Sequence, residues 1–194
     1  MTTESDIKYG LAGVVVDRTA VSKVMPETNS LTYRGYAVQD LAARCRFEQV
    51  AHLLLRGELP SAAEAAAFER EERSLRSLDA RTLAAIRLFP ADAHPMDTIR
   101  TAVSMMALSD PDVADLSPAA DARKAVRLLA RIPTAIAADF RLRRGQEPVP
   151  PRDDLSIAEN FFHMCFGEVP APEVVRCFDI SLILYAEHSF NAST

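Results

Sequence analysis

Apolar side chains recur at helical spacing along most of the chain after Tyr36. Val38 and Leu41 lie three positions apart, and a similar pattern returns between Phe47 and Leu55. A period of about 3.6 residues is typical of amphipathic helices. The same pattern predicts further helices with approximate bounds 61–78, 80–89, 94–107, 118–144, 156–166 and 172–190. The chain is therefore predicted to be mainly α.

The first 36 residues follow a different pattern. Residues 13–17 and 31–33 are short β-branched or aromatic runs, and residues 26–30 between them are turn formers. We expect a small β-hairpin or two extended arms. The predicted organisation is an N-terminal extended segment, residues 1–36, and a helical portion, residues 37–194.

Several residues mark where helices begin and end. Gly57 is expected to end the second helix, and Ser61 with Glu64 forms a capping box that begins the third. Asp79 is the expected N-cap of the next helix. Pro133 lies inside the longest helical pattern, and we expect it to kink or split that helix because proline lacks an N–H.

Residues 180–186 are apolar nearly all round the last predicted helix, in the order Ile-Ser-Leu-Ile-Leu-Tyr-Ala. A helix without a polar face is expected to be central and buried. The sequence ends at Thr194, directly behind this helix. We therefore expect a truncated domain rather than a complete one.

Composition narrows the class of protein. The chain has 194 residues, is 48% hydrophobic and carries a net charge of −5. A core of this size needs no metal or disulfide, and the apolar fraction excludes intrinsic disorder. Acidic groups outnumber basic ones, and the densest basic cluster is Arg143 with Arg144, which suits a helix C-terminus better than a nucleic-acid surface. We expect no nucleic-acid partner.

The location expected from the sequence is the cytoplasm. No apolar run reaches the ~20 residues of a membrane span, and the polar, acidic N-terminus is unlike a signal peptide. Cys45, Cys165 and Cys177 are odd in number, widely spaced and set in apolar helical contexts. Buried thiols in a reducing compartment are the simplest interpretation.

Three of the four histidines are interpreted as structural, or for His52 as structural or exposed. His52 lies on an amphipathic helix, and His94 precedes a proline at a helix start. His163 and Cys165 form an H-x-C grouping, but a structural zinc site needs four ligands at defined spacing, so no metal is expected. The acidic runs 69–72 and 153–154 are interpreted as a solvated helix face and a helix start rather than a catalytic carboxylate pair.

His188 is the candidate catalytic residue. It follows Tyr185 by three positions and Leu184 by four, so the three share one helical face. Desolvation there would lower the pKa of the imidazole and keep it neutral. A neutral imidazole can donate a hydrogen bond to a developing oxyanion. The alternative is a histidine that only satisfies a helix end.

Residues 185–194, which read Tyr-Ala-Glu-His-Ser-Phe-Asn-Ala-Ser-Thr, resemble the signature of the citrate synthase family. There, a histidine closes a buried helix and an Asn-Ala-Ser-Thr turn follows. Residues 31–36, Leu-Thr-Tyr-Arg-Gly-Tyr, resemble the family's N-terminal motif, and residues 94–97, 159–161 and 166–168 follow in the family's order. The resemblance covers the whole chain and about the N-terminal half of a family member.

Within the family, the Tyr-Ala-Glu-His sequence is most like 2-methylcitrate synthases. Residues 7–17 and 163–170 resemble the actinobacterial type of that enzyme. The implied fold is mainly α, a citrate synthase-like large-domain helical array with a small N-terminal β-hairpin. The implied reaction condenses propionyl-CoA with oxaloacetate and releases CoA, and the alternative is a citrate synthase that uses acetyl-CoA. The CoA thioester is then a substrate, and no cofactor is permanently bound.

The resemblance gives His188 the role of hydrogen-bonding the thioester oxygen as the enolate forms. Family members are homodimers, so a homodimer is expected. The family's second histidine, its aspartate base and its substrate-binding arginines follow the Asn-Ala-Ser-Thr turn, as does most of the small CoA-binding domain. The 194-residue chain is therefore expected to be an inactive portion of the enzyme. The alternative from another class is a non-catalytic helical interaction module.

Overall fold

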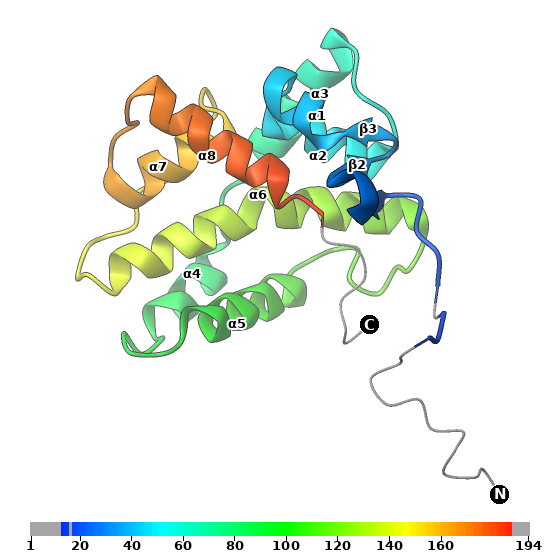
Figure 1. Ribbon diagram of the computed structural model, residues 1–194. Helices are drawn as coiled ribbons and strands as arrows, with labels where there is room; N and C mark the ends of the chain where they lie inside the picture. The colour runs from blue at the N-terminus through cyan, green and yellow to red at the C-terminus, as the bar shows by residue number, and fades with distance from the viewer. Residues whose placement is uncertain (1–12, 16, 188–194) are drawn as a thin grey trace, which may run out of the picture.

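The structure, a computed structural model, describes residues 13–15 and 17–187 (Figure 1). Within that part of the chain, three short strands precede eight α-helices. The strands are β1 (Ser22–Met25), β2 (Ser30–Tyr33) and β3 (Tyr36–Ala37). The helices are α1 (Val38–Arg44), α2 (Phe47–Arg56), α3 (Ala62–Ser74), α4 (Ala80–Arg87), α5 (Pro95–Leu108), α6 (Pro118–Leu142), α7 (Ile157–Phe166) and α8 (Pro172–Leu184). The predicted mainly α fold is confirmed.

The strands form one antiparallel sheet in the order β1-β2-β3. The turn expected at residues 26–30 is present, and it pairs Met25 with Ser30 and Val24 with Leu31. The first strand is therefore Ser22–Met25, and the expectation of a strand at residues 13–17 is wrong. A short turn sets the register for the residues that flank it directly, and residues 13–17 are too far from this one.

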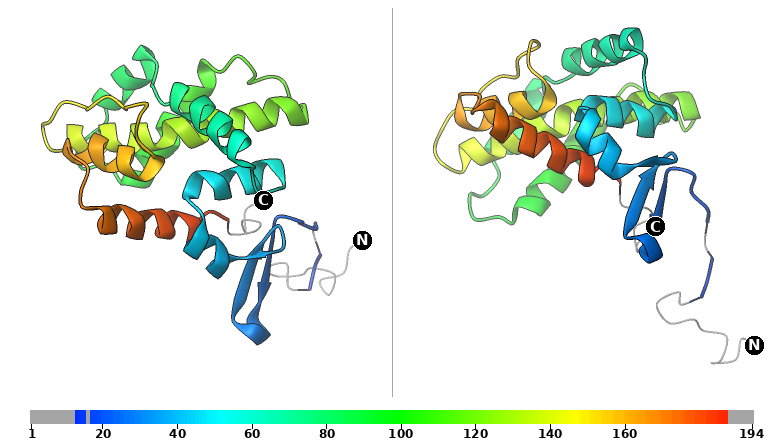
Figure 2. Two further views of the ribbon diagram at one scale, coloured as in Figure 1. Left: turned by 90° about the horizontal axis from the view of Figure 1, so that it is seen from above. Right: turned by 45° about the horizontal axis from the view of Figure 1, so that its top comes forward.

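The sheet projects away from the helices, as both views in Figure 2 show. β1 is largely exposed, and Val24 has 65% of its surface accessible. Only the end of β2 enters the helical body, where Tyr33 is fully buried. The sheet is thus attached to the rest of the molecule through its last residues and α1.

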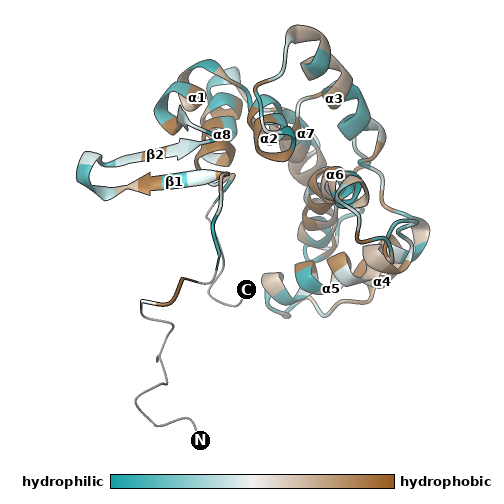
Figure 3. Ribbon diagram, turned by 90° about the vertical axis from the view of Figure 1, so that its right-hand side faces the viewer, coloured by the Kyte–Doolittle hydropathy of each residue, from teal (hydrophilic) through white to brown (hydrophobic). Residues whose placement is uncertain are grey.

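α6 is the central helix of the array. Seen end-on in Figure 3, it has other helices around it, and it contacts α3, α4, α5 and α7. Its buried positions are mostly small, which allows neighbouring helices to approach closely. They are Ala120, Val126, Ala130, Thr134, Ala135, Ala137 and Ala138.

Pro133 does not split α6, which runs unbroken from Pro118 to Leu142. A proline inside a helix removes one backbone hydrogen bond. Contacts made by the residues on both sides of Pro133 hold α6 in place. Arg131 Nε donates to the Leu75 carbonyl at 3.2 Å, and Thr134 Oγ1 donates to the Arg76 carbonyl at 2.9 Å. Tertiary contacts therefore outweigh the local defect.

The predicted helix starts are confirmed. Ser61 caps α3 in a complete capping box with Glu64. Asp79 accepts hydrogen bonds from the backbone of α4, and His94 Nδ1 accepts one from Met96 N at 3.2 Å. At the other end of a helix, Gly57 adopts a left-handed conformation with φ 98° and ends α2.

The acidic run 69–72 is not wholly a solvated face. Glu72 is 1% exposed and binds Arg76, which is 2% exposed, through two hydrogen bonds of 2.8 and 2.6 Å. Arg76 also donates to the carbonyls of Arg152 and Leu155 at 2.7 and 2.9 Å. This ion pair joins the end of α3 to the loop before α7. Its partners are 76 and 79 residues away, beyond the reach of local pattern.

The cysteines differ in exposure. Cys165 is buried, Cys45 is half-buried and Cys177 is exposed, and all three thiols are free. The expectation that all three are buried is therefore wrong for Cys177, which lies on α8 and is exposed. No helix among residues 13–15 and 17–187 is long and apolar enough to cross a membrane.

Candidate functional site

The candidate catalytic residue, His188, lies outside the described residues, so the site is described through the segment that leads to it. α8 ends at Leu184, with Tyr185 as its C-cap. Ala186 N donates to the Ile183 carbonyl at 3.3 Å, which is the tightened last turn common at helix ends. The helix predicted for residues 172–190 is therefore too long, because the chain has left it by Tyr185.

α8 buries one face rather than its whole circumference. Ile183 is fully buried and Asp179 is 6% exposed, whereas Leu184 and Tyr185 are 45% and 84% exposed. The helix contacts α1, α2 and α7. The expectation of a central, enclosed helix is thus wrong for the described residues, and the apolar ring is covered only where those neighbours pack.

The buried face of α8 contributes to an apolar cluster that also contains residues of β2, α1 and α2. Ile183 is a fully buried member of this cluster, and the partly buried Ala186 packs against it. The cluster consists of Tyr33, Val38, Leu41, Val50, Leu53 and Ile183. The sequence motif at residues 31–36 and the motif that begins at Tyr185 therefore meet in space.

Tyr33 makes the polar contact between these two motifs. Its hydroxyl donates to the Leu184 carbonyl at 3.1 Å, and a backbone hydrogen bond links the same hydroxyl to Glu187. Burial raises the pKa of the Tyr33 phenol, and the Glu187 charge raises it further against the opposing effect of that backbone hydrogen bond. The phenol therefore stays protonated and remains a donor at neutral pH.

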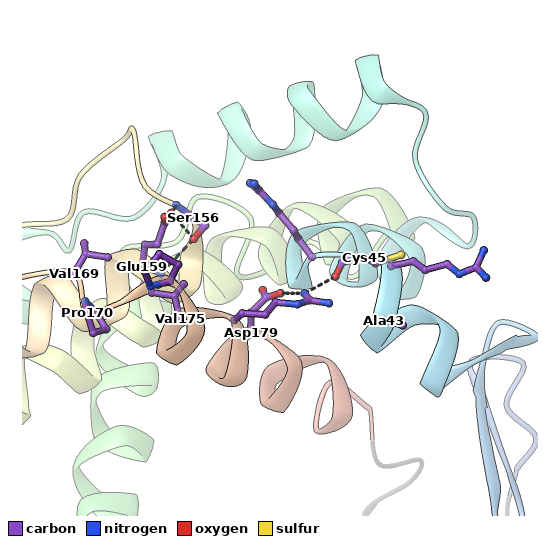
Figure 4. A pocket seen from close by; sticks show the side chains of 12 residues that line it. Ala43, Cys45, Ser156, Glu159, Val169, Pro170, Val175 and Asp179 are labelled. Carbon is purple, nitrogen blue, oxygen red and sulfur yellow. Dashed lines mark hydrogen bonds and ion pairs between the residues drawn. The ribbon is translucent and has the colours of Figure 1, made fainter.

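A cavity of about 460 Å³ with a mixed polar and apolar lining opens beside the N-terminal end of α8 (Figure 4). Ser156 and Glu159 of α7 lie on one side of it, Ala43 and Cys45 lie on the other, and Asp179 lies between them. The full lining comprises Ala43, Arg44, Cys45, Arg46, Ser156, Glu159, Val169, Pro170, Pro172, Val175, Arg176 and Asp179. The cavity is therefore a junction of α1, α2, α7 and α8.

Asp179 joins α8 to the beginning of α2. Its Oδ1 accepts a hydrogen bond from Phe47 N at 3.0 Å, and its Oδ2 accepts one from Arg176 Nη1 at 2.7 Å. Arg176 also donates to the carbonyls of Cys45, at 2.9 Å, and Ala42. Asp179 thus accepts from the first backbone N–H of α2, and Arg176 donates to carbonyls at the end of α1.

Glu48 makes the equivalent connection from α2 to α7. It is 3% exposed, and its Oε1 accepts a 2.6 Å hydrogen bond from Ile157 N. Its Oε2 is buried without a hydrogen-bond partner among the described residues. Burial raises the pKa of Glu48, and the charges of Asp179 and Glu72 add to the rise, whereas the Ile157 N–H opposes it.

The carboxylates that line the cavity accept hydrogen bonds from neighbouring residues. Ser156 donates to Glu159 Oε2 from its backbone N at 2.8 Å and from its hydroxyl at 2.7 Å, which lowers the pKa of Glu159. Asp179 is held by Phe47 N and Arg176. Both carboxylates are thus engaged in hydrogen bonds within the protein.

The other histidines lie in helices or at a helix start. His52 packs edge-on against Phe68, with ring centroids 5.4 Å apart, and its Nδ1 lies 3.0 Å from the Glu58 carbonyl. His94 caps α5. His163 lies in the last turn of α7. Among the residues that the structure describes, no group of three or more His, Cys, Asp and Glu side chains could hold a metal ion.

Sequence reasoning assigned no role to Tyr33, Glu48 or Asp179. The signal for Tyr33 was its place in the motif of residues 31–36, and the signal for the carboxylates was a lone acidic residue on an apolar helix face. Their partners lie 151, 109 and 132 residues away in sequence. Their contacts therefore become visible only in the folded chain.

Comparison with known proteins links this arrangement to one family. The sequence profile described as "Citrate synthase, C-terminal domain" matches residues 10–194. A 2-methylcitrate synthase of Mycobacterium tuberculosis is 59% identical over 97% of this chain and 48% of its own length. A citrate synthase of Mycolicibacterium smegmatis is 54% identical over 99% of this chain and 52% of its own length. The chain spans about half the length of the curated relatives it matches.

Solved structures agree with the sequence relatives. Citrate synthase from Pyrobaculum aerophilum superposes with a TM-score of 0.92 at 35% identity, over 100% of this chain and 50% of that one. Citrate synthase from Thermotoga maritima gives a TM-score of 0.83 at 30% identity, over 96% of this chain and 48% of that one. The fold expected from the sequence motifs is confirmed.

Proposed function

Because the chain belongs to the citrate synthase family, we propose that it forms part of a 2-methylcitrate synthase, which condenses propionyl-CoA with oxaloacetate and releases CoA. The observation that carries this proposal is the 59% identity with the M. tuberculosis 2-methylcitrate synthase over 97% of the chain. The sequence Tyr-Ala-Glu-His at residues 185–188 supports it.

His188 is the residue that we assign to the chemistry. A base, the family's aspartate by resemblance, takes an α-proton from the acyl-CoA; the thioester becomes an enolate, and negative charge develops on its oxygen. A neutral imidazole at His188 would donate a hydrogen bond to that oxygen and stabilise the charge as it forms. The enolate carbon then attacks the ketone of oxaloacetate, and thioester hydrolysis releases CoA.

The remaining features of the proposal follow from the family. The CoA thioester is a substrate, and no permanently bound cofactor is required. We assign residues 37–194 to the large domain and residues 1–36 to an N-terminal segment. We expect a homodimer, and we place it in the cytoplasm because its three free thiols fit a reducing compartment.

A citrate synthase that uses acetyl-CoA is the second candidate. The 54% identity with the M. smegmatis citrate synthase, over 99% of the chain, favours it. The two candidates share the aldol-type step and the role of His188. They differ in the acyl group, so the ratio of kcat/KM for propionyl-CoA and acetyl-CoA distinguishes them.

The test joins residues 1–194 to the other half of the M. tuberculosis relative and measures CoA release with a thiol reagent. The 194-residue polypeptide alone is expected to give no turnover, whereas the chimera is expected to turn over propionyl-CoA with a higher kcat/KM than acetyl-CoA. His188→Gln in the chimera should lower kcat by about 100-fold or more, because it removes an oxyanion donor.

His163→Gln is the matched control, since it replaces a histidine of the same chain away from the proposed chemistry and should leave kcat unchanged. A folded chimera without turnover for either acyl-CoA would contradict the enzyme proposal and favour the non-catalytic module. Turnover by the 194-residue polypeptide at the level of the chimera would contradict its inactivity.

A further inference from the structure

The cavity beside the N-terminal end of α8 has an excess of positive charge in its lining. Three guanidinium groups, those of Arg44, Arg46 and Arg176, line it together with two carboxylates, those of Glu159 and Asp179. Three positive groups and two negative ones leave a surplus of one positive charge. Both carboxylates already accept hydrogen bonds from neighbouring residues. The lining therefore favours a negatively charged ligand.

Arg176 is held in one orientation and still has donor capacity. Its Nη1 donates to the Cys45 carbonyl at 2.9 Å and to Asp179 Oδ2 at 2.7 Å, and its Nη2 donates to the Ala42 carbonyl. Its Nε has no hydrogen-bond partner among the described residues, and its side chain is 39% exposed. A guanidinium that the protein already fixes loses little side-chain entropy when it binds an anion.

Arg44 and Arg46 are exposed and carry charges that the protein does not neutralise. Neither side chain has a hydrogen bond or an ion pair with any residue in the described part of the chain. Elsewhere on the surface, Arg87 and Arg152 each bind a carboxylate. Two guanidinium groups at one cavity therefore keep their hydrogen-bonding capacity for a ligand.

The cavity also offers an apolar wall. Val169, Pro170 and Val175 lie together on one side of it (Figure 4). Its volume of about 460 Å³ lies within the range of about 300–1,000 Å³ that is typical of small-molecule sites. An apolar wall next to guanidinium groups suits an organic anion, whose carbon body can be covered while its charged groups are paired.

We propose that this cavity binds a small organic dianion, either a dicarboxylate or a phosphate ester. Arg176 donates from its Nε to one anionic oxygen, and Arg44 and Arg46 supply the remaining positive charge. The two arginines without partners are the reason for two negative charges on the ligand. The inference goes beyond the proposed function and does not depend on it.

The test titrates the ¹⁵N-labelled 194-residue chain with glutarate, glycerol 3-phosphate and the uncharged analogue glutaramide. The amide signals of residues 43–46 and 173–176 report binding at the cavity. We expect saturable shifts of these signals with at least one of the two dianions, with a dissociation constant of about 1 mM or lower, and none with glutaramide. Added salt should weaken the binding, because it screens exposed charges.

The double variant Arg44→Gln with Arg46→Gln should raise the dissociation constant of the bound dianion by about tenfold, because it removes two exposed positive charges. These side chains have no partners in the described part of the chain, so the variant should keep the wild-type thermal midpoint. Arg70→Gln with Arg81→Gln is the matched control. It replaces two exposed arginines outside the cavity, gives the same net charge and should bind as the wild type does.

The outcomes decide both the site and its ligand. Binding of glutarate alone would identify a dicarboxylate site, and binding of glycerol 3-phosphate alone would identify a phosphate ester site. The proposal is overturned if neither dianion shifts the cavity amides saturably, or if glutaramide binds as tightly as glutarate. Equal weakening in the two double variants would also overturn it, because net charge rather than the cavity would then attract the anion.

Discussion

Asp179 and Glu48 each satisfy the first backbone N–H of a helix other than their own. Asp179 of α8 accepts from Phe47 of α2, and Glu48 of α2 accepts from Ile157 of α7. Carboxylates suit helix N-termini because the helix dipole is positive there. Two single side chains therefore hold three helices at fixed angles beside the cavity.

The buried carboxyl of Glu48 gives a prediction about pH. Its pKa is raised in the folded state, so the folded protein binds more protons than the unfolded chain between the usual Glu pKa of about 4.3 and the raised value. The free energy of unfolding contributed by this group is greatest below that window and falls as the pH rises through it. Glu48→Gln should remove this pH dependence, so urea unfolding of both proteins should show the variant gaining stability relative to wild type as the pH rises.

Glu58→Gln serves as the control for this experiment, because Glu58 is exposed. Its stability should follow the wild type at every pH. A constant difference between Glu48→Gln and wild type across the whole range would show that burial does not govern the ionisation of Glu48.

At the scale of elements, local signals were sufficient where a helix begins with its own side chain. Ser61, Asp79 and His94 were predicted as helix starts and are caps in the structure. Local signals failed at Pro133, where tertiary contacts keep α6 continuous. They also failed at β1, because turn register rather than β propensity selects the paired residues.

The Glu72–Arg76 pair gives a prediction about how elements are joined. Arg76→Ala leaves the Glu72 carboxylate buried without its partner and frees the carbonyls of Arg152 and Leu155. Breaking a buried ion pair in this way costs about 3–5 kcal/mol of unfolding free energy. Urea denaturation monitored by circular dichroism measures this loss.

Arg100→Ala provides the comparison, since Arg100 and its partner Asp97 are 78% and 58% exposed. Exposed pairs contribute little, so this variant should unfold at the wild-type urea concentration. Equal losses in the two variants would mean that burial does not set the strength of the pair.

At the scale of the whole molecule, the arrangement around α6 predicts unequal local stability. α6 contacts α3, α4, α5 and α7 along its length, whereas β1 is an exposed edge strand whose partner in the described sheet is β2. Native-state hydrogen exchange should therefore be slowest in α6 near Val126 and Ala137 and faster by several orders of magnitude in β1. Protection of the Val24 amide equal to that of Val126 would contradict this picture.

The family and the helical fold could be predicted from sequence because several short motifs occur in order along the chain. The one-sided burial of α8 could not, because an apolar ring shows only that a helix avoids water and not which neighbours cover it. The meeting of Tyr33 with Leu184 was equally hidden, since 151 residues separate them. Side chains next to a helix start determine where several helices begin. Contacts between residues far apart in sequence bring the two motifs together.

Those distant pairings also bear on how the chain folds during synthesis. The cluster that receives Tyr33 is completed by Ile183, and α2 receives its cap from Asp179. At 5–20 residues per second, a ribosome needs roughly 7–30 s to make the ~150 residues between the two motifs. Until α8 leaves the exit tunnel, the nascent strands and first helices lack their final packing partner, so this interval is when a chaperone would have most of their apolar surface to bind.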